Sequence, residues 1–466
     1  MQTRFTAAQL QDPGVAACEP ILRKCVHCGF CTATCPTYVL LGDELDSPRG
    51  RIYLIKEMLE NDRPASAEVV SHVDRCLSCL ACMTTCPSGV HYQHLIDHAR
   101  VHVEKTYRRP LLERALRASL AAVLPYPRRF GAVLALVPLA RPFAKLLPAR
   151  VRAMLELVPV RSRPDAVVTV ADRRTAEADS GAHAPDEAER RAANDGRRVF
   201  RARGERRARI GLLTGCVQTV LEPSINAAMI RLLTRAGCEV VTISGCCGSL
   251  VHHLGRERAA LEFGARVIEQ VDTERRGGGL DALVANASGC GTHAKDYGHL
   301  FRNHPLAAHA AETSLRARDV TELLAEIGLP PVREPPRLTV AYHSACSMQH
   351  GQKLDEPPRA LLRQAGFVVR EIAEGHLCCG SAGTYNILQP EIAARLRERK
   401  VGNVVRTGAD IVATGNIGCI AQLTAGTALT VAHTVELLDW ATGGPKPVEI
   451  PHHPAATSRD AAADSG

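Results

Sequence analysis

The chain has 466 residues, which is too long for one compact core, so we expect roughly two to four domains. Aromatic residues make up only 4% of the sequence, with a single tryptophan, which argues against a nucleic-acid surface built on stacked bases. The 57 basic residues exceed the 49 acidic ones, and the formal net charge of +8 would suit an acidic partner or an anionic lipid surface.

The 18 cysteines are too many and too regularly spaced for incidental thiols. Residues Met1 to Leu10 lack the apolar core of a signal peptide, and grouped cysteines in a cytoplasmic protein are more often metal ligands than disulfides. No stretch reaches the roughly 18 apolar residues of a membrane-spanning helix. We therefore expect a cytoplasmic, metal-binding protein, and any membrane contact would be peripheral, at the inner face.

Residues 1–108 contain two cysteine runs, Cys25–Pro36 and Cys76–Pro87, and both read C-x₂-C-x₂-C-x₃-C-P. This is the spacing of ferredoxins with two [4Fe–4S] clusters, in which the fourth cysteine of each run ligates the other cluster. A pair of zinc sites is the alternative, but zinc usually joins two C-x₂-C pairs from separate parts of a chain. The predicted ligands are Cys25, Cys28, Cys31 and Cys86 for the first cluster, and Cys76, Cys79, Cys82 and Cys35 for the second.

The insert between the two runs has the pattern of a helix. Ser47 followed by Pro48 is typical of a helix start, and apolar residues from Tyr53 to Leu59 follow on a helical period. The first domain is therefore predicted to be an α-helical ferredoxin domain.

Residues 109–207 are expected to form a basic helical segment and a flexible linker. Helices are predicted at 111–124 and 146–157, whereas 161–207 are rich in Arg, Ala, Asp and Glu and poor in large apolar residues. At the other end of the chain, residues 446–466 are expected to form a polar tail.

Residues 208–445 contain an internal repeat, divided into domains at 208–330 and 331–445. Corresponding cysteines are separated by 130 residues (Cys216 and Cys346), 132 residues (Cys246 and Cys378) and 129 residues (Cys290 and Cys419). Apolar strands alternate with helical patterns, which predicts βαβ units with parallel sheets. The predicted strands are Ile210–Leu213, Val240–Ile243, Ala282–Ala285, Leu338–Tyr342, Val368–Ile372 and Ile411–Ala413, and the predicted helices include Ala227–Ala236 and Ile392–Val405.

Each half of the repeat offers four cysteines beyond strand ends, where open α/β folds bind their ligands. They are Cys216, Cys246, Cys247 and Cys290 in the first half, and Cys346, Cys378, Cys379 and Cys419 in the second. Three interpretations stay open: a further iron–sulfur cluster, a zinc or mixed structural site, or a thiol–disulfide centre or remnant of an ancestral cluster. Nearby histidines are more often packed or surface side chains than ligands, namely His252, His253, His293, His343 and His376.

A helical two-cluster ferredoxin domain followed by two Cys-Cys-Gly (CCG) domains resembles a known group of proteins. The group includes iron–sulfur subunits of glycolate oxidase, anaerobic glycerol-3-phosphate dehydrogenase and lactate-utilisation complexes, and the catalytic subunit of heterodisulfide reductase. The chain is most similar to the glycolate oxidase iron–sulfur subunits, and the resemblance covers nearly everything outside 109–207. The segments that carry it are Asp74–Cys79, Thr85–Val90, Gly215–Gln218, Asn286–Gly291 and Thr414–Cys419.

One departure from the group concerns the CCG domains. Those that bind unusual clusters end in C-x-x-C, whereas here Cys290 is followed by His293 and Cys419 by Gln422. The missing fifth cysteine argues against a noncubane cluster. We expect an α+β multi-domain fold: the helical ferredoxin domain plus two repeated α/β CCG domains.

The resemblance implies an electron-transfer subunit with no catalytic residue of its own. FAD-binding flavoprotein partners would oxidise a 2-hydroxy acid, most closely glycolate to glyoxylate, and electrons would pass through the clusters to a quinone or another carrier. No flavin-binding G-x-G-x-x-G follows a strand, and Gly277–Gly279 does not fit that pattern, so the flavin is expected on a partner. The alternatives are a disulfide or heterodisulfide reductase that uses the CCG cysteines, and the same role for glycerol 3-phosphate or lactate.

Overall fold

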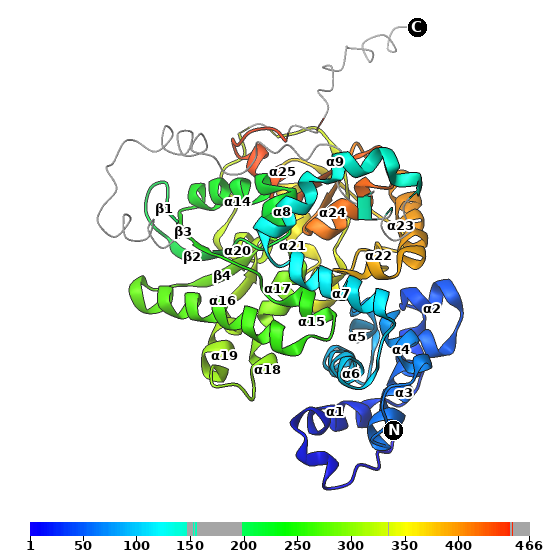
Figure 1. Cartoon of the computed structure of the whole chain (residues 1–466). Coiled ribbons are helices and arrows are strands. Elements are labelled where there is room, and N and C mark those ends of the chain that lie inside the picture. The colour runs from blue at the N-terminus through cyan, green and yellow to red at the C-terminus, as the bar shows by residue number, and fades with distance from the viewer. Residues whose placement is uncertain (147–151, 153, 156–197, 334, 448–449, 451–466) are drawn as a thin grey trace.

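The computed structural model describes residues 1–146, 152, 154–155, 198–333, 335–447 and 450. The predicted helix at 146–157 and the predicted linker and tail lie largely outside these residues. Within them, the chain forms a helical N-terminal part followed by two α/β halves (Figure 1). The predicted fold class is therefore confirmed.

The N-terminal part is helical, as predicted. Asp12 caps the first helix and Ser47 caps the third, where its side chain accepts a hydrogen bond from the backbone N–H of Gly50. Proline stands at the start of the first three helices, where its missing N–H costs nothing. The main helices are α1 (Pro13–Lys24), α2 (Pro36–Leu41), α3 (Pro48–Glu60), α4 (Ala67–Asp74), α5 (Ala81–Thr85) and α6 (Tyr92–Thr106).

Three further helices run from the N-terminal part across the α/β halves (Figure 1): α7 (Leu111–Val123), α8 (Pro127–Ala135) and α9 (Val137–Ala140). The bounds of α7 match the predicted helix at 111–124. Buried Arg109 fixes its start, since the guanidinium lies 2.5 Å from Asp74 on α4 and 2.7 Å from Glu104 on α6. No single described helix is long and apolar enough to span a bilayer, although the bent pair Leu111–Val123 and Pro127–Phe143 passes that test of length and composition.

Each α/β half contains a parallel sheet. The first has the order β1-β3-β2-β4-β5 and the second β7-β6-β8-β9, and only the edge strand β1 is antiparallel to its neighbour. Without β1 the two orders are identical, which confirms the internal repeat. The strands are β1 (Val199–Phe200), β2 (Ala208–Leu213), β3 (Cys238–Ile243), β4 (Ala282–Ala285), β5 (Ala317–Asp319), β6 (Thr339–Tyr342), β7 (Val368–Glu371), β8 (Ile411–Thr414) and β9 (Thr430–His433).

Helices connect the strands of both halves. In the first half they are α13 (Gln218–Leu221), α14 (Pro223–Arg235), α15 (Ser249–His253), α16 (Glu257–Gly278), α17 (Ser288–Lys295), α18 (Tyr297–Leu300), α19 (Ala307–Arg316) and α20 (Val320–Ile327). In the second half they are the π-helix η6 (Ser347–Gln352), α21 (Glu356–Gln364), α22 (Tyr385–Leu388), α23 (Pro390–Val405), α24 (Ile417–Thr424) and α25 (Thr434–Ala441).

The two halves share one hydrophobic core, in which Ile210 and Val240 of the first half are buried together with Val340 and Ile411 of the second. Helix α14 packs on α25, and α20 packs on α21. Buried Asp439 on α25 joins the halves further, because it accepts hydrogen bonds from two arginines of α14. The halves therefore pack as a single unit and bring their strand ends close to the ferredoxin domain.

Candidate functional site

The first cavity of the ferredoxin domain is lined by Cys25, Cys28, Cys31 and Cys86, the four cysteines predicted for the first cluster, and also by Cys82, which lines the second cavity as well. The cavity has a volume of about 430 Å³, including the part that is open to solvent. Cys25 and Cys28 lie on the coil after α1, Cys31 lies in the short 3-10 helix η2 (Phe30–Thr32), and Cys86 follows α5. The structure thus gathers the first three cysteines of one run with the last cysteine of the other.

The second cavity is lined by Cys76, Cys79, Cys82 and Cys35, the set predicted for the second cluster, around about 320 Å³ of space. Burial raises the pKa of the Cys79 and Cys82 thiols well above the usual value. Thiolates at these positions therefore need the positive charge of bound iron. Four soft sulfur donors in each mainly apolar cavity fit a [4Fe–4S] cluster.

Left-handed residues explain how each run curls around its cavity. His27 and Gly29 have φ values of 55° and 88°, and the corresponding residues of the second run, Ser78 and Leu80, have 49° and 63°. Two such residues between three cysteines turn the chain sharply, so that successive thiols face the same space. The left-handed conformation of Leu80 is strained, and it persists because it brings the flanking cysteines to face the same cavity.

Arg51, which the sequence analysis missed, lies fully buried beside the second cavity. Its Nη1 is 3.9 Å from Cys35 Sγ, and its other nitrogens donate to Asp46 Oδ1 at 3.1 Å and to the carbonyl oxygen of His72 at 2.6 Å. Asp46 also accepts from Arg75 at 2.8 Å, so this carboxylate is shared. A cluster with four thiolate ligands is negatively charged, and the Arg51 guanidinium is placed to offset that charge.

The four cysteines of the first CCG half come together beyond β2, β3 and β4. Hydrogen bonds from the thiols of Cys216 and Cys247 lower the pKa of the Cys246 thiol, and the Gly248 N–H also points at its sulfur, at 3.4 Å. The Cys247 thiol also contacts that of Cys290. The half thus forms a continuous chain of four sulfurs that favours a thiolate at Cys246.

The second CCG half repeats this arrangement with two sulfur–sulfur contacts, Cys346 to Cys378 at 3.7 Å and Cys379 to Cys419 at 3.5 Å. Gly380 has φ +93°, and an added Cβ would lie 2.6 Å from a backbone oxygen of α23, so only glycine fits here. Gly248 occupies the same position in the first half, with φ +95° and a backbone oxygen of α16 at 2.8 Å.

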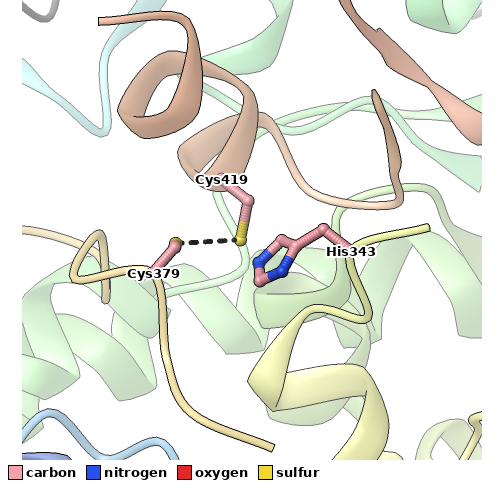
Figure 2. Close-up of side chains that lie close together, drawn as sticks. All are labelled: His343, Cys379 and Cys419. Carbon is pink, nitrogen blue, oxygen red and sulfur yellow. Dashed lines mark hydrogen bonds between the residues drawn. The ribbon is translucent and has the colours of Figure 1, made fainter. Parts of the chain in front are cut away.

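The neighbouring histidines differ in placement. The ring of His343 faces the sulfurs of Cys379 and Cys419, and the three ligand atoms lie within 4.8 Å of one another (Figure 2). His293 is buried with its ring centroid 5.1 Å from that of His252. His376 is only half-buried, beside the CCG loop.

The second ferredoxin cavity lies directly against the second CCG half. Cys79 packs in one apolar cluster with Cys378 and Cys346. Tyr385 Oη donates to the carbonyl oxygen of Arg75 at 3.1 Å, which ties the two domains together at this point. The second thiol set therefore packs against the wall of the buried cluster cavity.

Comparisons with known proteins agree with both motif sets. The cysteine-rich domain family CCG matches residues 210–295 and 340–424, and the 4Fe-4S dicluster domain matches residues 24–90. The glycolate oxidase iron–sulfur subunit of Escherichia coli (strain K12) is 38% identical over 446 residues, covering 95% of this chain and 99% of that protein.

Two other relatives are more distant. The probable glycolate oxidase iron–sulfur subunit of Bacillus subtilis (strain 168) is 29% identical over 88% of this chain and 89% of its own length. Lactate utilization protein A of Exiguobacterium sp. is 26% identical over 49% of this chain and 96% of its own length. Because the similarity to the Escherichia coli protein extends over nearly the whole of both chains, this chain belongs to the family of glycolate oxidase iron–sulfur subunits.

Proposed function

We propose that this chain carries electrons from a flavoprotein that oxidises glycolate to glyoxylate, through two [4Fe–4S] clusters, to an acceptor such as a quinone. The observation that carries the proposal is the pair of adjacent cavities, which share Cys82 in their lining. Each contains the first three cysteines of one run and the last cysteine of the other. The family supports glycolate as the substrate of the complex, since the named relatives are glycolate oxidase subunits.

The cysteines of each cavity would hold one cluster, which supplies one-electron transfer when bound. Cys28 is exposed, so the first cavity opens to the surface, whereas the second cavity is buried against the CCG half. Buried residues around the second cavity exclude water. The Arg51 guanidinium would balance the negative charge of a cluster bound there. The chain therefore provides a surface point of electron entry and an internal relay.

An apolar rim around the first cavity supports docking of the electron donor. Val26 and Phe30 flank Cys28 and are 66% and 61% exposed. Exposed apolar side chains beside a redox centre suit a partner surface that excludes water during transfer. No flavin-binding glycine motif follows a strand in this sequence, so the flavin is expected on a partner. We therefore assign this rim as the surface on which that flavoprotein docks.

Helices α7–α9 support a peripheral membrane contact, which would bring the chain to a quinone. Leu136 and Leu139 are 62% and 71% exposed, and Arg128 and Arg129 precede them on α8. Leu112 on α7 is 87% exposed. Apolar side chains next to cations favour the interface of an anionic bilayer. Leu139→Asp should reduce flotation with anionic vesicles, whereas Leu315→Asp, on α19, should not, and equal flotation would exclude this surface.

The substrate is tested by an anaerobic pull-down of the chain from its native cells, with cluster absorbance followed on addition of glycolate. Bleaching, with a flavoprotein in the eluate, is the expected result. Bleaching only with lactate or glycerol 3-phosphate would keep the electron-transfer role and change the substrate.

A cysteine-centred disulfide reductase is the second candidate, favoured by the touching thiols of the CCG halves. No bleaching and no flavoprotein in the pull-down would support it. Replacing Cys378 and Cys379 by alanine would then abolish disulfide reduction while the ferredoxin clusters stay intact. Electron transfer from glycolate that survives this replacement would exclude it.

A further inference from the structure

Three side chains from different segments converge in the second CCG half. His343 directly follows β6, Cys379 lies on the loop after β7, and Cys419 lies on α24 after β8 (Figure 2). A hydrogen bond of 2.8 Å from the His343 backbone N–H to the Ala413 oxygen fixes the end of β6 beside β8. All three side chains are buried, and each offers one ligand atom within 4.8 Å of the other two.

His343 lacks the partners that a buried imidazole normally has. The residue is only 2% exposed, and within the described part of the chain neither of its ring nitrogens has a hydrogen-bond partner. Buried polar atoms are normally paired, so an unpaired imidazole nitrogen that faces two thiols is available as a ligand atom.

The distance between the Cys379 and Cys419 sulfurs is compatible with a single bound ion. Two thiolates on one tetrahedral zinc ion, with bonds of about 2.3 Å, lie about 3.8 Å apart. The Cys379 and Cys419 sulfurs are 3.5 Å apart. Cysteine sulfurs that bind different irons of a [4Fe–4S] cluster lie further apart, because the distance between the two irons is added. The spacing therefore fits two ligands of a single ion.

We propose that His343, Cys379 and Cys419 bind one Zn²⁺ ion. Two thiolates and one imidazole are a known zinc donor set, and a fourth position remains for water or another thiolate. The corresponding residue of the first half is Leu213, so the repeat carries this site only once among its described residues. The ion would clamp three strand ends next to the second cluster cavity, and since zinc has no redox chemistry it would take no electrons.

This site does not depend on the proposed electron-transfer function, and metal content tests it directly. In the full chain purified anaerobically with its partners, we expect about one zinc ion in addition to the iron of the ferredoxin domain. His343→Ala should lose the zinc and keep the iron and the visible absorbance. His343→Cys should keep the zinc, because a thiolate replaces the imidazole.

His376→Ala is the matched control, since it removes a half-buried imidazole two residues before Cys378 and should leave zinc unchanged. X-ray absorption at the zinc edge of the unmodified protein should show both nitrogen and sulfur neighbours, and it decides the matter even if His343→Ala fails to fold. Equal zinc in His343→Ala, a sulfur-only zinc shell, or iron in place of zinc would each overturn the proposal.

Discussion

Replacing Arg51 by glutamine should lower the reduction potential of the cluster in the second cavity. The guanidinium lies 3.9 Å from Cys35 Sγ and stabilises an added electron on the cluster. The substitution removes this charge, while Asp46 keeps its contacts with Arg75 at 2.8 Å and with His72 at 2.9 Å. The carboxylate therefore stays paired, and the change should act mainly on the cluster.

The expected magnitude follows from Coulomb's law. At an effective dielectric constant of about 20, two unit charges 3.9 Å apart interact by about 4 kcal/mol. The added electron is spread over the cluster, at about twice that distance, and Asp46 cancels part of the field, which leaves about 1–2 kcal/mol. Since about 2.3 kcal/mol corresponds to 100 mV for one charge, the potential should fall by about 50–100 mV.

A redox titration followed by electron paramagnetic resonance measures this shift for each cluster. Arg51→Lys keeps the charge and should restore most of the potential. Arg49→Gln is the control, since Arg49 lines the first cavity and pairs with Glu44 at 2.6 Å, so it should leave the second cluster unchanged. An unaltered second potential in Arg51→Gln, with both clusters present, would refute the reasoning.

Three further changes have defined outcomes. Cys28→Ser should remove the first cluster and about four of about eight irons, measured by metal analysis, with the second cluster's signal retained. Asp439→Asn should lower the free energy of unfolding by about 3 kcal/mol in urea titrations, because it removes the ion pairs that Arg231 and Arg235 make between the halves. Burial lowers the pKa of His433 to about 4, whereas the pKa of an unfolded histidine is about 6.5. As the pH drops from about 6.5 to about 4, the unfolded chain binds a proton that the folded chain does not, so the free energy of unfolding should fall by about 3 kcal/mol. His433→Asn, which keeps a helix cap, should flatten that dependence, and an unchanged slope would exclude His433 as its source.

Local spacing made much of the fold predictable. The cysteine runs curl because of residues within the runs themselves, so their pattern carries the geometry of the cavities. The predicted strands agree with the structure to within about two residues, since each is a short apolar run before a cysteine. The short strands β1, β5 and β9 were not predicted, because runs of two to four residues are too short to show a period.

The contributions of Arg51 and His343 could not be predicted, because both depend on tertiary packing. An arginine on a helix usually points to solvent, and only the packing of α3 against Asp46 and the second cavity buries Arg51. His343 follows a strand as any packed histidine could, and it meets Cys379 and Cys419 only once three distant segments converge. Sequence spacing contains no signal for such a meeting.

The packing of α14 on α25 and of α20 on α21 has a consequence for how the repeat can behave. Helix α14 of the first half packs on α25, the last helix of the second half. Helix α21 of the second half packs on α20, the last helix of the first half, so the contacts are reciprocal. Two subunits of a symmetric dimer meet in this way. The repeat is thus a dimer tethered within one polypeptide, and the connection keeps each half at a high effective concentration for the other. Neither half can exchange partners or be removed without exposing the apolar surface that they share.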